Sequence, residues 1–83
     1  MRSLTGPELA ALLSDAGGPP DVTLDPEAFM STPFADLGYD SLAVLETLTL
    51  VQARWGVSLP DDVVAAATNP ADLLVVLNRE LVA

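Results

Sequence analysis

The sequence predicts an all-α protein: a small bundle of three longer helices plus one short helix, with a long ordered loop between helices one and two. Three observations support this fold class. Apolar residues make up 51% of the 83 residues, which is enough for the core of one small domain. They recur at helical spacings, and no credible pair of strands is present. Capping residues, prolines and glycines divide the chain into segments.

The first helix is predicted at about residues 6–16. Thr5 and Glu8 form a capping box, with Pro7 in the first turn. One helical face carries the apolar side chains Leu9, Leu12, Leu13 and Ala16. The run from Gly17 to Pro20 then ends the helix.

Residues 17–40 lack a sustained periodicity, and a loop of this length in a small domain is usually functional. Asp25 and Pro26 indicate a short helix that ends near Met30. We expect five apolar side chains to hold the loop on the core: Val22, Leu24, Phe29, Phe34 and Leu37.

The second helix is predicted from Ser41 to Trp55, with Gly56 after its end and Arg54 in its last turn. One stripe, expected to face the core, contains Val44, Leu48, Val51 and Trp55. Another side contains Leu42, Leu45, Glu46, Thr49 and Ala53. Two interpretations of Leu42 and Leu45 remain open: part of a wide buried face, or an exposed apolar docking patch beside Glu46.

The last third of the chain predicts two further helices. Pro60, followed by Asp61 and Asp62, starts a short helix through about Ala67. A second start signal lies in residues 68–72. The final helix then has one apolar face, with Leu73, Leu74, Leu77, Leu81 and Val82.

Composition excludes several functions. The net charge is −9, and the only cations are Arg2, Arg54 and Arg79, so nucleic acid and anionic membrane are poor partners. Proteins with basic patches suit this acidic surface better. The chain has no cysteine or histidine, and it shows neither a signal peptide nor an apolar run long enough to span a membrane. We therefore expect a cytoplasmic protein, acting as a monomer.

Ser41 is a candidate functional residue because two capping residues stand where one helix begins. If Asp40 is the cap and accepts the amide of Leu42 or Ala43, the Ser41 hydroxyl is free at a helix N-terminus, where an attached phosphate is favoured. An ordinary capping pair fits the spacing equally well. Catalysis by Ser41 is disfavoured, because no histidine or lysine is available as its base.

The stretch DLGYDSLAVLE, residues 36–46, strongly resembles the phosphopantetheine-attachment motif of acyl carrier proteins. The resemblance covers nearly the whole chain, so residues 1–83 are expected to form one acyl carrier domain. It includes the Trp55-Gly56 helix end and the following VSLPDD segment. It is greatest for the stand-alone carriers of bacterial type II polyketide synthases, which build aromatic polyketides.

The resemblance implies a non-catalytic carrier whose Ser41 receives 4'-phosphopantetheine from coenzyme A through a phosphopantetheinyl transferase. The thiol of that arm would carry malonyl and growing polyketide chains as thioesters. Asp40 and Leu42 would contact the transferase, and Glu46 would be an anionic recognition residue. Further partners implied are a malonyl transferase, a ketosynthase with its chain-length factor, and a tailoring ketoreductase or cyclases.

The sequence departs from fatty-acid carriers, which usually have several acids along this helix, because Glu46 is the only acid there. Exposed ion pairs contribute only about 0–1 kcal/mol each, so docking would rely more on Leu42 and Leu45. Acids elsewhere would contribute, namely Asp36, Asp61 and Asp62, although the last two also suit a helix N-terminus. Leu45, Leu48, Val63 and Val64 either line a groove for the carried chain or are ordinary core.

Two alternatives are of other kinds. In the first alternative, the chain carries fatty acyl or aminoacyl groups, although Tyr39 stands where aminoacyl carriers more often have glycine. Otherwise it would be a helical docking module with no prosthetic group, in which Ser41 stays unmodified.

Overall fold

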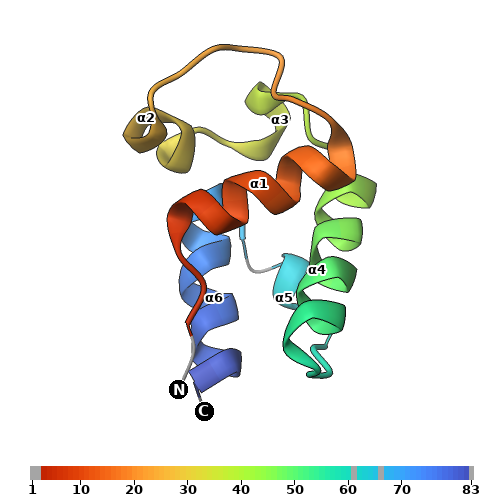
Figure 1. The fold of residues 1–83 in the computed structure, drawn as a ribbon. Coiled ribbons are helices and arrows are strands. Elements are labelled where there is room, and N and C mark those ends of the chain that lie inside the picture. The colour runs from red at the N-terminus through yellow and green to blue at the C-terminus, as the bar shows by residue number, and fades with distance from the viewer. Residues whose placement is uncertain (1–2, 61, 66, 83) are drawn as a thin grey trace.

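The computed structural model describes residues 3–60, 62–65 and 67–82, and the described chain is entirely helical and loop. The longer helices are α1 (Gly6–Gly17), α4 (Ser41–Trp55) and α6 (Pro70–Val82). The short helices are α2 (Pro26–Ser31), α3 (Phe34–Leu37) and α5 (Asp62–Ala65). Figure 1 shows α1 crossing the ends of α4 and α6, with α2 and α3 beyond it. The predicted all-α bundle is confirmed.

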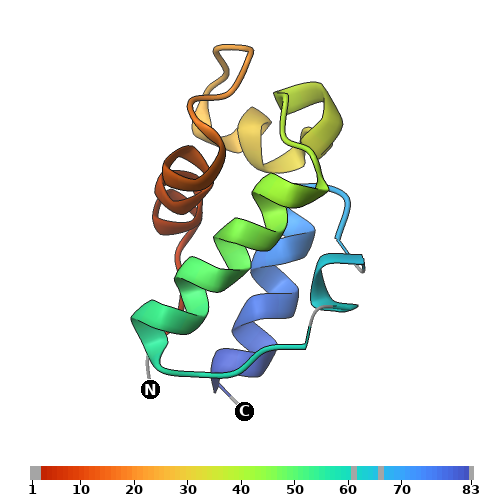
Figure 2. The same cartoon turned by 90° about the vertical axis from the view of Figure 1, so that its right-hand side faces the viewer.

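α4 and α6 are joined through the helices on either side of them. α1 contacts both, and so does α5. Figure 2 shows α1 and α5 on opposite sides of the α4–α6 pair. Among the described helices, α1 and α5 make the main contacts with α4, and they leave one flank of α4 open.

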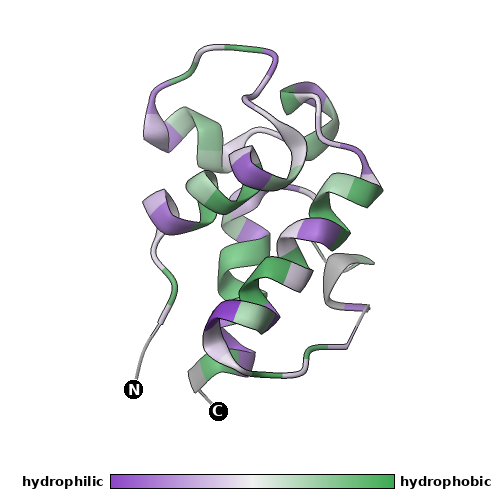
Figure 3. Cartoon of the chain, turned by 45° about the vertical axis from the view of Figure 1, so that its right-hand side comes forward, coloured by the Kyte–Doolittle hydropathy of each residue, from purple (hydrophilic) through white to green (hydrophobic). Residues whose placement is uncertain are grey.

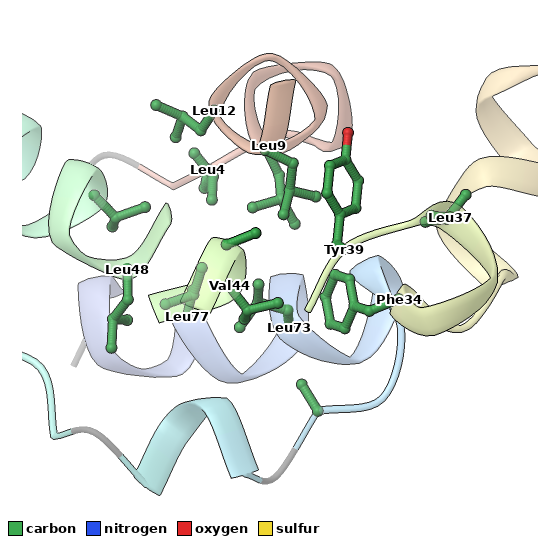
Figure 4. Packing of buried hydrophobic residues seen from close by; sticks show 14 of the residues in the cluster. Leu4, Leu9, Leu12, Phe34, Leu37, Tyr39, Val44, Leu48, Leu73 and Leu77 are labelled. Carbon is green, nitrogen blue, oxygen red and sulfur yellow. The ribbon is translucent and has the colours of Figure 1, made fainter. Parts of the chain in front are cut away.

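The core lies where the three longer helices converge. Figure 4 shows their buried side chains meeting those of the loop between α1 and α4; they include Leu9, Leu12, Phe34, Tyr39, Val44, Leu48, Leu73 and Leu77. The chain start is held to α6 by Asn78, whose Oδ1 accepts the Leu4 amide at 2.7 Å and whose Nδ2 donates to the Leu4 carbonyl at 3.0 Å. Residues at the two ends of the chain thus close the same core.

α1 begins as its sequence predicts. The Thr5 hydroxyl accepts the Glu8 amide at 3.3 Å, and the Glu8 carboxylate accepts the Thr5 amide at 3.0 Å. This reciprocal pair satisfies two donors that would otherwise lack partners at the helix start. The observed end at Gly17 is one residue beyond the predicted one.

The loop between α1 and α4 contains one helix more than predicted. α2 begins after Asp25, whose carboxylate accepts the Ala28 amide at 2.8 Å. The unpredicted α3 is a single turn between Pro33 and Gly38. A hydrogen bond from the Phe34 amide to the Thr68 carbonyl ties this turn to the segment before α6. Such a turn is too short to leave an apolar periodicity in the sequence.

The prediction for the apolar side chains of this loop is correct for three residues and wrong for two. Phe29, Phe34 and Leu37 are buried, whereas Val22 is 41% exposed and Leu24 40% exposed. The last two lie in an extended segment that passes outside α1, so no second layer covers them.

α4 matches its predicted bounds, and Gly56 ends it in the left-handed conformation with φ 65°. α5 is shorter than predicted: Pro60 precedes it, and Ala67 is buried outside any helix. The Leu59 amide donates to Gln52 Oε1 at 2.7 Å, which keeps the chain extended along the end of α4. α6 starts as predicted, since Asn69 accepts the Asp72 amide at 2.8 Å.

Candidate functional site

Asp40 is the N-cap of α4, and Ser41 is the first residue of the helix. The Asp40 carboxylate accepts the Ala43 amide at 2.9 Å, as predicted for this residue. Ser41 is exposed, and its hydroxyl makes no hydrogen bond to any part of the chain that the structure describes. The capping requirement is therefore met without Ser41, and its hydroxyl faces solvent at the positive end of a 15-residue helix.

Tyr39 fixes the segment that leads into the site. It is only 4% exposed, and its hydroxyl donates to the Gly18 carbonyl at 3.0 Å. Its ring also lies so close to Gly17 that a Cβ there would be 2.9 Å from Tyr39 Cδ1. Burial raises the pKa of Tyr39 above 10.0; a hydrogen bond from Ser14 lowers it in part, and the charge of Asp21 raises it again. The end of α1 and the start of α4 are thus held in one position.

Gly38 lies two residues before Asp40, the N-cap of α4. It ends α3 with φ 86°, a conformation that other residues rarely adopt. A Cβ at this position would overlap the Asp21 carboxylate. The side chain of the preceding loop therefore occupies this space, and glycine is required by the turn itself.

The solvent side of α4 carries apolar residues directly after Ser41. Leu42 is 61% exposed and Leu45 37% exposed, and Glu46 beside them is also exposed. Most of the α4 ribbon is coloured as hydrophobic in Figure 3, with a few hydrophilic residues between. Of the two interpretations that the sequence left open, the structure supports the exposed patch. We call Leu42, Leu45 and Glu46 the α4 patch.

The core side of α4 includes two residues that the predicted stripe omitted. Ala43 is 7% exposed, and Thr47 is fully buried, with its hydroxyl donating to the Ala43 carbonyl at 2.9 Å. Val44, Leu48 and Val51 are buried as predicted, whereas Trp55 is only partly buried. The predicted stripe omitted Thr47 because its side chain is polar. Its position four residues after Ala43 nevertheless places it on the same helical face.

A shallow depression of about 210 Å³ adjoins Ser41. Its walls come from the end of α1, from Gly38 and from the first turns of α4, with Asp40, Leu42 and Glu46 among them. A neighbouring depression of about 270 Å³ continues along the seam between α1 and α4, lined by residues that include Asp15, Glu46 and Leu50. The structure thus brings together three of the predicted recognition residues and adds Asp15 of α1, which the sequence did not single out.

The surroundings of Ser41 are acidic. Asp15, Asp21, Asp36, Asp40 and Glu46 are all exposed carboxylates on four neighbouring segments. Within the described residues the cations lie elsewhere: Arg54 is at the far end of α4, with its guanidinium 5.9 Å from the centre of the Trp55 ring, and Arg79 is near the end of α6. The site therefore presents negative charge to an approaching partner.

The other predicted recognition residues are not part of these depressions. Asp62 is exposed at the start of α5, and Asp61 lies outside the described residues. Neither α4 residue of the predicted groove for the carried chain lines a groove in the structure. Leu48 is 2% exposed and belongs to the core, whereas Leu45 faces solvent. The side chains of Val63 and Val64 lie outside the described part, so that groove remains a prediction.

None of the helices in the described part of the chain combines the length and apolar character needed to cross a bilayer.

The chain belongs to the family defined by the phosphopantetheine attachment site, whose family model matches residues 9–75. Ser41 and the α4 patch lie inside the matched range. The prosthetic group of this family is 4'-phosphopantetheine, held covalently by an acyl carrier protein.

Among its relatives, the carriers of polyketide synthases span nearly the same length. The chain is 40% identical to the actinorhodin polyketide synthase acyl carrier protein of Streptomyces coelicolor, over 94% of this chain and 91% of that protein. It is 38% identical to the monensin polyketide synthase acyl carrier protein of Streptomyces virginiae, over 99% and 92%. These relatives support a polyketide acyl carrier role for this chain.

Solved structures of the actinorhodin carrier from S. coelicolor share the fold. The apo protein superimposes with a TM-score of 0.82 at 39% identity, covering 98% of this chain and 94% of that chain. The form carrying a 3,5-dioxohexyl group, described as a triketide mimic, gives 0.80 at 37% identity with the same coverage. The likeness thus extends to a carrier with an attached acyl group.

The described residues fit the prosthetic group of the family. Its phosphate would join a serine oxygen that is exposed and free of internal hydrogen bonds, at a helix N-terminus whose dipole favours an anion. The positive φ of Gly38 and the cap at Asp40 set where this helix begins. No rearrangement of the core is needed to reach the Ser41 oxygen.

Proposed function

We propose that Ser41 is the attachment residue, and that the chain carries malonyl and growing polyketide groups between the enzymes of a type II polyketide synthase. The observation that carries this proposal is the free Ser41 hydroxyl, left over because Asp40 caps α4. The thiol of the attached arm would hold the acyl group as a thioester. The chain itself supplies the serine, the fixed helix start and the surface that partners contact. We propose that residues 1–83 form this one carrier domain.

Recognition is assigned to the α4 patch together with Asp40. Leu42 is the most exposed of the large apolar side chains on α4 and directly follows Ser41. An enzyme that receives the arm in its active site must therefore cover Leu42 and the depression beside it. Burial of Leu42 and Leu45 would supply affinity, and the surrounding carboxylates would speed the encounter with a basic partner surface.

The proposed partners are those that handle the arm in turn. A phosphopantetheinyl transferase attaches it, a malonyl transferase loads it, and a ketosynthase with its chain-length factor extends the chain. A ketoreductase or cyclases then modify the product. Asp36, Asp61 and Asp62 are proposed to contribute at the edges of these contacts.

The test is the intact mass of the protein after incubation with coenzyme A and a broad-specificity phosphopantetheinyl transferase. We expect one phosphopantetheine to be added to the unaltered chain and none to Ser41→Ala. Ser58→Ala is a matched control, because Ser58 is also exposed but lies outside α4. The Ser58→Ala variant should receive the arm as fully as the unaltered chain. Addition that persists in Ser41→Ala, or no addition to the unaltered chain, would overturn the assignment.

A further inference from the structure

Gly17, the last residue of α1, lies against the start of α4. A Cβ at this position would be 2.9 Å from the Ala43 Cβ and 2.9 Å from Tyr39 Cδ1, closer than the carbon atoms of packed side chains approach. These two neighbours stand on either side of Ser41 along the chain, each two residues away from it. We call Gly17, Tyr39 and Ala43 the α1–α4 contact. It holds the chain both before and after the proposed attachment residue.

Backbone conformation does not explain the glycine at position 17. Gly17 lies within α1 and has no positive φ, unlike Gly18, whose φ is 81°. Alanine stabilises a helix more than glycine does, because glycine loses more backbone entropy on folding. The reason for glycine here is therefore space. A larger residue would have to push Tyr39 or Ala43 away from α1.

Tyr39 is also held by hydrogen bonds from its side chain and from its backbone. Its hydroxyl donates to the Gly18 carbonyl at 3.0 Å, and its amide donates to the Phe34 carbonyl at 2.9 Å. The Phe34 amide in turn donates to the Thr68 carbonyl at 2.9 Å, just before α6. Figure 4 shows Tyr39 beside α1, with Phe34 toward α6. Tyr39 is thus tied to α1 and to the start of α6.

The Ser41 side chain has no such support of its own. It is exposed, and its hydroxyl makes no hydrogen bond within the described part of the chain. The place of the Ser41 oxygen is therefore set by the backbone, which the α1–α4 contact holds on both sides. Position matters for a group transfer, because a misplacement of about 1 Å can cost about 10²-fold in rate.

The proposed modification makes a strict demand on that position. The Ser41 oxygen forms a bond to the phosphorus atom of coenzyme A that bears the pantetheine. The phosphoanhydride bond of this phosphorus breaks, its electron pair leaves with adenosine 3',5'-bisphosphate, and the serine proton passes to a base of the transferase. The attacking and leaving oxygens must lie roughly in line with the phosphorus. Binding of the transferase to the α4 patch does not by itself supply this alignment.

We propose that the α1–α4 contact positions Ser41 for phosphopantetheine transfer, with Gly17 as the residue that determines its geometry. The proposal rests on the proposed function, because Ser41 must be the residue that receives the arm. The contact acts through the backbone, so it should control kcat, the rate of transfer within the bound complex. Binding relies on the α4 patch, which the contact does not include, so KM should change little.

The experiment measures kcat and KM of a broad-specificity phosphopantetheinyl transferase for the apo chain and for Gly17→Ala. Coenzyme A is saturating, and the product is quantified by intact mass. We expect Gly17→Ala to lower kcat about ten-fold and to change KM less than about two-fold, because the added methyl group displaces Tyr39 and Ala43. An unchanged kcat, or a rise in KM alone, would overturn the proposal.

Gly6→Ala is the matched control for Gly17→Ala. It makes the same substitution at the other end of α1, where the added Cβ would be an ordinary 3.7 Å from Met30 Cε. Both kinetic constants should stay at the values of the unaltered chain. An equal loss of kcat in the two variants would contradict a specific role for the α1–α4 contact.

Two further variants separate positioning from stability. Leu77→Ala removes a fully buried side chain of α6 and should lower stability without altering the contact. Measured below its unfolding temperature, it should keep the kcat of the unaltered chain, and a loss equal to that of Gly17→Ala would overturn the proposal. Tyr39→Phe keeps the ring but loses the hydrogen bond to Gly18, and it should lower kcat a few-fold. If Gly17→Ala fails to fold, an unchanged kcat in Tyr39→Phe overturns the proposal.

Amide ¹H–¹⁵N spectra of the apo variants provide a readout that needs no enzyme. Gly17→Ala should shift the amide signal of Ser41, and Gly6→Ala should not; an unshifted Ser41 signal in Gly17→Ala would count against the proposal. The two proposals fail differently. If the unaltered chain gains no arm, the proposed function is wrong. If it gains the arm and Gly17→Ala reacts equally fast, only the positioning role is wrong.

Discussion

The two sides of α4 carry similar residues in very different surroundings. On the core side Val44, Leu48 and Val51 are each at most 3% exposed, whereas Leu42 and Leu45 on the solvent side are 61% and 37% exposed. Leucines three residues apart thus serve different purposes. Hydrophobicity alone therefore does not decide which leucines of α4 are buried; their position around the helix relative to α1 and the rest of the core does.

The same division applies to the residues just before the helix. Tyr39 is buried against α1, and Asp40 and Ser41 are exposed. The chain therefore turns from core to surface within one residue. This abrupt change keeps the Ser41 oxygen accessible while the backbone behind it is held by the core.

The largest expected effect comes from a pair of identical substitutions on the two sides. Leu48→Ala should lower the free energy of unfolding by about 2–5 kcal/mol, because it leaves a cavity in the core. Leu45→Ala should lower it by only about 1 kcal/mol, because Leu45 is 37% exposed and its truncation leaves no closed cavity. Urea unfolding of both variants measures the difference. Similar losses for the two would mean that the solvent side of α4 is packed.

An intermediate effect is expected at Tyr39, through pH. Its folded pKa is raised, so the folded chain holds the phenol proton more tightly than the unfolded chain, whose tyrosine has a pKa of 10.0. The stability linked to this proton is fully present below pH 10 and is lost as the pH rises through the folded pKa. The chain has one tyrosine and no lysine, so few other groups titrate there.

Tyr39→Phe separates this linkage from packing. At neutral pH it should reduce stability by about 1 kcal/mol through the lost hydrogen bond to Gly18. Above pH 10 its unfolding free energy should decline less steeply than that of the unaltered chain. Thermal unfolding across this pH range, with phenolate absorbance followed alongside, tests both points. Parallel curves for the two proteins would show that the pKa of Tyr39 is the same in the folded and unfolded chains.

The smallest effect on stability is expected at Glu46, on the solvent side. Glu46→Lys should change the unfolding free energy by less than about 0.5 kcal/mol, because the residue is exposed. It should slow association with the cognate ketosynthase a few-fold at low salt and flatten the salt dependence of that rate. Stopped-flow measurements at several salt concentrations would show this.

Glu80→Lys is the matched control for Glu46→Lys. It makes the same charge reversal at an exposed position near the end of α6, away from Ser41. If both variants slow association equally, net charge alone steers the encounter. A rate unaffected by Glu46→Lys would leave Leu42 and Leu45 as the main determinants of docking.

Local signals in the sequence were sufficient to predict the helix ends, because capping residues and glycines set these ends through nearby contacts. The Thr5–Glu8 capping box, the Asp40 cap and Gly56 each act within a few residues, and they placed the ends of α1 and α4 closely. The same reasoning made Ser41 a candidate, because a helix needs only one cap, and the structure shows that Asp40 provides it. The resemblance of residues 36–46 to carrier proteins then indicated the chemistry.

Other features depend on residues that are distant along the chain. Thr47 is buried and Leu24 exposed, against their hydropathy, because α1 packs against one side of α4 while nothing in the described structure covers the outer loop. The additional turn α3 is tied to the carbonyl of Thr68, more than thirty residues away. A periodicity within one segment contains no information about such partners.

The helical class and the ends of the long helices followed from the sequence, since caps, helix breakers and periodicity are short-range properties of the chain; the same signals made Ser41 a candidate without excluding an ordinary cap. Only the tertiary structure decided that the α4 patch faces solvent and that Tyr39 locks the start of α4 to the end of α1. These depend on how the helices are placed against one another, and burial is a property of that packing.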